Sequence, residues 1–167
     1  MTREEEIVHP TKNDLPETAR TKLAELLNAR LADGIDVYLQ AKQAHWNVKG
    51  PAFYALHKLF DEIADGTREH VDELAERIAQ LGGIAEGTLA AVKKRTKLAE
   101  YPLALVEGKE HLEALRGALA TFAAATRTSI DEATDARDAD TADLFTEVSR
   151  AADKYLWLVE AHLQATR

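Results

Sequence analysis

The stretch HWNVKGPAFYALHKLFDEIADGTREHVDELAE, residues 45–76, decides the organisation of this chain. It places four side chains at two steps of four residues, His57 with Asp61 and Asp72 with Glu76. Side chains four residues apart lie one turn apart on the same face of a helix. At about 100° per residue, with His57 at 0°, the other three lie near 40°, 60° and 100°. All four therefore share one stripe, roughly a quarter of the helix circumference wide.

The two pairs are too far apart to bind one ion within a single helix. Asp61 and Asp72 are eleven residues apart, about 16 Å along the axis, whereas a metal ion binds its ligands at about 2 Å. A second copy, antiparallel across a two-fold axis, would bring the His57 end of one chain onto the Glu76 end of the other. Such a contact is self-complementary, so it would create two identical sites. Gly66 lies almost midway, where we expect the two helices to approach most closely.

Simpler interpretations exist for each of these residues. Helix-surface acids are usually solvated, and Asp72 and Glu76 could pair with Arg68 or with neighbouring lysines. His45, near a helix end, could interact with the negative end of the helix dipole. His70 and His111 fit no such pattern and are expected to be surface or structural histidines. It is the joint spacing that favours a metal site.

Hydrophobic periodicity predicts four long helices. The first two are joined by a short turn at Gly50-Pro51, and Gly82-Gly83 stops the second. The 21 residues that follow are too many for a hairpin and are long enough to return along the bundle. They should carry a short helix within 89–96, and Asp140 is the expected cap of the last helix. The four long helices should run over about 16–46, 53–81, 103–134 and 141–163.

Five segments resemble the DNA-protection-during-starvation (Dps) family of ferritin-like proteins. They are KQAHWNVKG, ALHKLFDE, HVDELAERIAQLGG, DTADLF and KYLWLVEAHL, and they occur in the family's order. The similarity spans about Pro16 to Leu163 and is most specific over residues 45–83. It implies an all-α, ferritin-like four-helix bundle with one long crossover carrying a short helix. The expected domains are an N-terminal tail, residues 1–15, and the bundle, residues 16–167.

The resemblance also implies a ligand set for iron. In the family, the iron-oxidation site lies at a two-fold subunit interface. The matching positions here are His45, His57 and Asp61 of one chain with Asp72 and Glu76 of its neighbour, and all five match in residue type. The resemblance further implies two-fold dimers assembled into a hollow shell of twelve subunits. One or two iron ions, Fe(II) and then Fe(III), would bind at each intersubunit site.

The acidic segment DEATDARDADTADLF, residues 131–145, has two interpretations. Helix capping and solubility explain it without any special function. In the resembled family, carboxylates near the corresponding helix start line three-fold pores that draw iron inward, because a ring of carboxylates concentrates cations. Asp138, Asp143 and Glu147 are the pore candidates, with Asp143 the foremost.

Composition narrows the class of protein. The chain has 167 residues, 46% of them hydrophobic and 30% charged, with 8 Gly and 4 Pro, which indicates one folded, mostly helical domain. It lacks a run of about 18 apolar residues and an apolar secretory signal, so we expect a cytoplasmic protein without a membrane span. The absence of cysteine excludes disulfides and thiolate ligands and is compatible with oxidant handling.

Charge argues against a dedicated nucleic-acid binder. The formal net charge is −8, and an acidic surface repels the phosphate backbone. Some family members contact DNA through a lysine-rich tail. Residues 1–15 of this chain carry two basic and four acidic side chains, a net charge of −2. No basic extension follows the last expected helix in this sequence. We interpret the one dense basic cluster as a solvated loop or an interface partner for acidic surface; its members are Lys93, Lys94, Arg95 and Lys97.

Ligand chemistry favours iron as the substrate. Imidazole and carboxylate ligands suit iron, manganese or zinc, but zinc cannot cycle between oxidation states. Typical ferritins hold iron inside one bundle through Glu-x-x-His motifs, and none of the four expected long helices contains one. Together with this ligand chemistry, the resemblance implies a ferroxidase that oxidises Fe(II) with hydrogen peroxide or dioxygen, stores the Fe(III) as mineral and so protects DNA. The alternative is a nucleoid-associated protein that shields DNA by direct non-specific binding.

Overall fold

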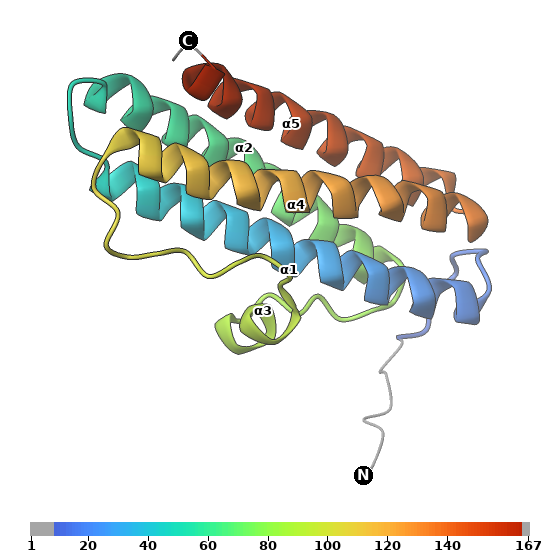
Figure 1. The fold of residues 1–167 in the computed structure, drawn as a ribbon. Coiled ribbons are helices and arrows are strands. Elements are labelled where there is room, and N and C mark those ends of the chain that lie inside the picture. The colour runs from blue at the N-terminus through green and yellow to red at the C-terminus, as the bar shows by residue number, and fades with distance from the viewer. Residues whose placement is uncertain (1–8, 165–167) are drawn as a thin grey trace.

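Four long helices lie side by side in the computed structural model, which describes residues 9–164. A fifth, short helix, α3, lies outside the bundle against α1 (Figure 1). The predicted all-α bundle with a short crossover helix is thus confirmed. No helix in the described part of the chain is long and apolar enough to cross a lipid bilayer. The elements are α1 (Glu17–Asn47), α2 (Phe53–Gln80), α3 (Leu89–Arg95), α4 (Gly108–Asp135) and α5 (Ala139–Gln164).

A five-residue turn joins α1 and α2 and folds them back on each other. Gly50 has φ +110°, a conformation that residues with a Cβ rarely adopt, and Pro51 follows it directly. The ring of His45 on α1 stacks on that of His57 on α2 across this turn. At the other end, α2 stops where Gly82 adopts φ +85° and the Gly83 N–H bonds the Ile78 carbonyl.

The long crossover, residues 81–107, runs back along the bundle before α4 begins (Figure 1). Asp33 of α1, fully buried, accepts hydrogen bonds from Arg30 (2.7 Å) and from the Lys97 N–H (2.9 Å). Asp36, one turn further on, accepts one from the Thr96 hydroxyl at 2.7 Å. These bonds fasten the segment after α3 to α1, so the crossover is anchored by buried polar contacts as well as by packing.

The core lies between the four long helices and is built from large apolar side chains. It includes residues from every long helix, so burial holds all four together. Its fully or almost fully buried members include Leu27, Leu31, Val37, Phe60, Ile63, Leu74, Ile78, Leu115, Leu119, Phe122, Phe145, Val148 and Val159.

Two predicted helix starts were wrong. The third long helix begins at Gly108, five residues after the predicted start, because Glu107 and Glu110 form a reciprocal capping box there. The last long helix begins at Ala139, and its cap is Asp138 rather than Asp140, since the Asp138 carboxylate accepts the Thr141 N–H at 3.2 Å.

The spacing predicted that Gly66 marks the closest approach of two subunits. The structure shows instead that Gly66 packs against α5 of its own chain. A Cβ added there would lie 1.7 Å from the Tyr155 hydroxyl oxygen and 2.9 Å from the Tyr155 Cζ atom. Gly66 is about 180° around α2 from His57, on the side that faces α5 of the same chain. Its missing side chain therefore serves a close approach within one bundle.

Gly66→Ala is expected to lower the free energy of unfolding by about 1–3 kcal/mol, because the rigid Tyr155 ring must move away from the new methyl group. The helix propensity gained by alanine, roughly 1 kcal/mol, offsets part of a larger steric cost. Urea unfolding measures the difference. In a Tyr155→Phe background, which removes the nearest atom, the same substitution should cost less. An equal cost in both backgrounds would show that Tyr155 is not the obstruction.

Candidate metal centre

The two predicted histidine ligands face each other across the α1–α2 turn. The ring centroids of His45 and His57 are 3.7 Å apart and the ring planes are 16° from parallel. The His45 Nδ1 atom lies 2.7 Å from the His57 carbonyl oxygen, and the His57 Nδ1 atom lies 2.8 Å from the His45 carbonyl oxygen. A carbonyl only accepts, so each Nδ1 carries the proton and donates it. In the neutral imidazole, this tautomer leaves the lone pair of each Nε2 atom for a metal ion.

Asp61 joins these histidines from the next turn of α2. Its Oδ1 atom lies 3.8 Å from His45 Nδ1 and 2.7 Å from the Nζ atom of Lys42, and its side chain is 34% exposed. The hydrogen bond from Lys42 lowers the pKa of Asp61 below 3.8, so this carboxylate is ionised at neutral pH. The structure thus brings three predicted ligands together, His45, His57 and Asp61, which we call the histidine half-site.

Lys42 is a residue of this site that the sequence reasoning missed. It lies one turn before His45 on α1, and its ammonium group sits 5.7 Å from the centroid of the Trp46 ring. A spacing of three residues from a predicted ligand was the available signal. Because Lys42 occupies the Oδ1 atom of Asp61, a cation that binds this carboxylate competes with the ammonium group for its negative charge.

The other two predicted ligands lie further along α2 and are exposed to solvent. Asp72 and Glu76, which we call the carboxylate half-site, make no ion pair with any residue from 9 to 164, including Arg68. Two oxygen-rich side chains one turn apart can contribute to binding a hard cation but leave most of its coordination sphere open. Their exposure leaves both carboxylates available to a partner.

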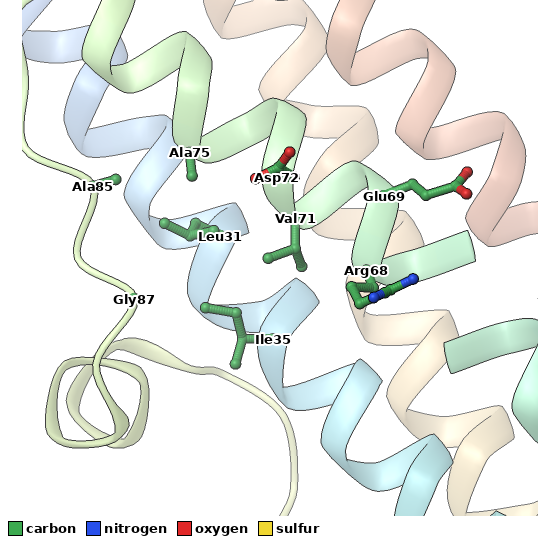
Figure 2. A pocket seen from close by; sticks show the side chains of 9 residues that line it. All are labelled: Leu31, Ile35, Arg68, Glu69, Val71, Asp72, Ala75, Ala85 and Gly87. Carbon is green, nitrogen blue, oxygen red and sulfur yellow. The ribbon is translucent and has the colours of Figure 1, made fainter. Parts of the chain in front are cut away.

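A surface hollow of about 620 Å³ opens beside the carboxylate half-site. Figure 2 shows Asp72 and Arg68 on α2 at its edge, with the side chains of Leu31 and Ile35 on α1 forming an apolar floor. Val71 and Ala75 continue this floor on α2. An apolar hollow of this size, rimmed by charged groups, is typical of a surface that a partner covers.

Within residues 9–164, no three His, Asp or Glu side chains are arranged so that they could hold a metal ion. The histidine half-site has two imidazoles and one carboxylate, of which Lys42 occupies an oxygen. The carboxylate half-site lies eleven or more residues further along the same helix. The two half-sites thus stay separate within one chain.

The predicted pore residues fall into two groups. Asp138 is buried, with 4% of its side chain exposed, and accepts two hydrogen bonds from Arg77 Nη2, at 2.9 and 3.0 Å. It also accepts one from the Thr141 hydroxyl, so it is a structural cap rather than an open pore ligand. Asp143 and Glu147 are exposed, one turn apart near the start of α5, and both stay pore candidates.

His70 and His111 are placed as expected, one on the surface and one in the interior. His70 pairs with Glu73 at 3.0 Å on the surface, and His111 is buried beside the Tyr101 hydroxyl at 2.6 Å. In the basic cluster, Arg95 binds the carboxylates of Glu86 and Glu25 of the same chain, both at 2.7 Å. Most of the tail, residues 1–8, lies outside the described part of the chain.

Comparison with known proteins identifies the family to which this chain belongs. A family model of the ferritin-like domain matches residues 24–167, so the chain is a ferritin-like protein. A DNA protection during starvation protein of Agrobacterium fabrum is 47% identical over 156 residues, which cover 93% of this chain and 96% of that protein. The chain belongs to the Dps family of ferritin-like proteins.

Solved structures agree with this placement. DpsA14 from Streptomyces coelicolor superposes with a TM-score of 0.90 at 33% identity, covering 96% of each chain. A Dps protein from Vibrio cholerae superposes with a TM-score of 0.87 at 27% identity, covering 92% of this chain and 96% of that one. The Vibrio protein is described as a member of a broad superfamily of ferritin-like diiron-carboxylate proteins.

Proposed function

We propose that the protein is a ferroxidase and iron store that binds Fe(II) between two copies of the chain. The observation that carries this proposal is the division of five suitable ligands into two half-sites. Four of the ligands share one face of α2, and His45 on α1 stacks on His57. His45, His57 and Asp61 of one chain would combine with the partner subunit's Asp72 and Glu76. Two identical centres would form around each two-fold axis.

The donor set suits the substrate. Two imidazole nitrogens and three carboxylates match the preferences of Fe(II), and the carboxylates stabilise the higher charge of Fe(III). Because both Nδ1 atoms are fixed by backbone carbonyls, both imidazoles are held with Nε2 available as a ligand. The set leaves coordination positions for an oxidant, and each centre would hold one or two iron ions.

The reaction balances with hydrogen peroxide as the oxidant. Two Fe(II) ions each lose one electron, and the two electrons break the O–O bond of one peroxide molecule. With two protons, the products are two Fe(III) ions and two water molecules. Peroxide and Fe(II) are thereby removed together, and this would protect DNA chemically without contact. Dioxygen is the alternative oxidant.

Transport and storage complete the proposal. Twelve subunits would enclose a hollow shell in the cytoplasm, with Fe(III) stored inside as mineral. Asp143 and Glu147 would line three-fold entry pores, where their combined negative potential raises the local Fe(II) concentration. Direct binding to DNA is not part of the proposed function, because the net charge is −8 and Arg95 is already paired with carboxylates.

Lys42→Met is expected to tighten Fe(II) binding about 3- to 10-fold, since the ammonium group then no longer competes for Asp61. Anaerobic Fe(II) titration measures the affinity. Lys22→Met is the matched control, because Lys22 is exposed on the same helix but lies 20 residues, more than five turns, before Lys42. Weaker binding in Lys42→Met alone would mean that Lys42 positions Asp61 for the metal ion instead of competing with it.

The proposed function is tested by anaerobic Fe(II) titration of the full chain, followed by peroxide or air, with the assembled mass measured on the same sample. We expect saturation at one or two Fe(II) per subunit and then rapid formation of Fe(III) within an intact assembly. Oxidation no faster than in buffer alone, in a sample that is fully assembled, would reject a ferroxidase and leave a structural shell.

A further inference from the structure

One charged pair on the half-site face of α2 has no role in the proposed centre. Asp65 and Arg68 are both exposed, and neither makes an ion pair with any residue the structure describes. By helical position they lie near 80° and 20° when His57 is at 0°, inside the stripe that carries the ligands. Both side chains therefore point to the same side as the two half-sites.

The register of the proposed two-fold contact places these charges opposite each other. With the two α2 helices antiparallel, His57 faces the partner subunit's Glu76. One turn inward, Asp61 faces the partner subunit's Asp72. A further turn inward, Asp65 faces the partner subunit's Arg68, and by symmetry Arg68 faces the partner subunit's Asp65. The same step of four residues produces all three pairs.

The surroundings favour a second copy of the chain as the partner. Arg68 stands at the rim of the 620 Å³ hollow, whose floor is apolar (Figure 2). Covering that floor removes apolar surface from water, and closing the rim partly desolvates the charges. Gly66 is already covered by Tyr155 of the same chain, whereas the half-site face of α2 is exposed and free for this contact.

We propose that Arg68 of each subunit forms an ion pair with the partner subunit's Asp65, once on each side of the two-fold axis, and that these two pairs set the register in which the half-sites meet. This inference rests on the proposed function, because the half-sites define the register. Charges at the centre of an interface act mainly on specificity and alignment, and like charges placed opposite each other weaken association strongly.

Charge reversal tests the pairing. Asp65→Arg and Arg68→Asp each place like charges together twice per dimer, so each should shift association to about tenfold higher protein concentration or more. The double variant Asp65→Arg/Arg68→Asp restores opposite charges and should return association to within about threefold of wild type. Sedimentation of the full chain over a dilution series measures this. Asp131→Arg and Arg150→Asp, exposed on α4 and α5, are controls with equal charge changes.

A neutral series guards against misfolding of the reversed variants. Asp65→Asn, Arg68→Gln and the double variant should all weaken association, and the three effects should be similar to one another. Either single change already removes the ion pair. Single variants that associate like wild type, or a charge-reversed double variant as weak as the singles, would overturn the pairing. Iron oxidation is read separately. If the charge-reversed double variant restores association but the wild-type protein shows no ferroxidase activity, the proposed function is rejected and the ion pair is retained.

Discussion

Asp72→Ala is expected to lower the rate of Fe(II) oxidation by about 100-fold or more, although Asp72 belongs to the half-site that contains no histidine. A carboxylate ligand that stabilises developing Fe(III) contributes several kcal/mol, and each 1.4 kcal/mol is a factor of ten in rate. In the proposed centre, Asp72 would meet the Asp61 end of the partner subunit. Stopped-flow absorbance after addition of peroxide to Fe(II)-loaded protein measures the rate.

The matched control for this prediction is Glu73→Ala. Glu73 is the neighbouring exposed acid on α2, but it lies about 100° away from Asp72 and pairs with His70. Its loss should leave the oxidation rate unchanged. Because Asp72 is exposed, neither substitution should change the free energy of unfolding by more than about 0.5 kcal/mol. A normal rate in Asp72→Ala, with the assembly intact, would remove Asp72 from the centre.

Asp138→Ala is expected to have the largest effect on stability, about 2–4 kcal/mol at pH 7. The substitution removes the cap of α5 and leaves the Arg77 guanidinium without its buried carboxylate partner. Denaturant unfolding of the full chain measures the loss. Asp140→Ala is the control, because the side chain of Asp140 is 85% exposed and lies 4.0 Å from Arg77. It should cost no more than about 0.5 kcal/mol.

The pH dependence gives this prediction a second test. Burial raises the pKa of Asp138, but hydrogen bonds from Thr141 and Arg77 outweigh burial and hold the folded pKa below 3.8. A group with a lowered folded pKa stabilises fully above its unfolded pKa and loses that effect as pH falls through the folded value. The difference between wild type and Asp138→Ala should therefore be constant near neutrality and shrink below about pH 4. A difference that grows in acid would contradict this account.

Strong chain breakers explain which parts of the fold the sequence could predict. Gly50-Pro51 and Gly82-Gly83 are incompatible with continued helix, so the bounds of α1 and α2 were predicted to within one residue. After Pro102, the residues Leu103, Ala104 and Leu105 are good helix formers. The start of α4 was therefore misplaced, although Glu107 and Glu110 carried a capping signal.

Spacing predicted which residues share a helix face, but not which neighbour covers that face. The expected convergence of His45, His57 and Asp61 followed from helix periodicity and a short turn. In the structure the two imidazole rings stack, and Asp61 lies 3.8 Å from His45. Gly66 was misplaced because only its midway position was considered, whereas the same periodicity puts it about 180° from His57. That it meets Tyr155 could not be predicted without knowing where α5 packs. The sequence alone could not distinguish a buried helix cap from a pore ligand at Asp138. The distinction depends on its hydrogen bonds with Arg77, which is 61 residues away in sequence.

The central claim is that two chains together build each iron centre. Co-expression of a His57→Ala/Asp61→Ala chain with an Asp72→Ala/Glu76→Ala chain tests it most directly, because every mixed dimer then has one centre with all its ligands and one with only His45. Each variant alone should oxidise Fe(II) at the background rate. Random pairing makes half of the dimers mixed, so the co-assembled protein should recover roughly a quarter of the wild-type rate. Recovery of no activity, in mixed assemblies of normal mass, would contradict a centre shared between subunits.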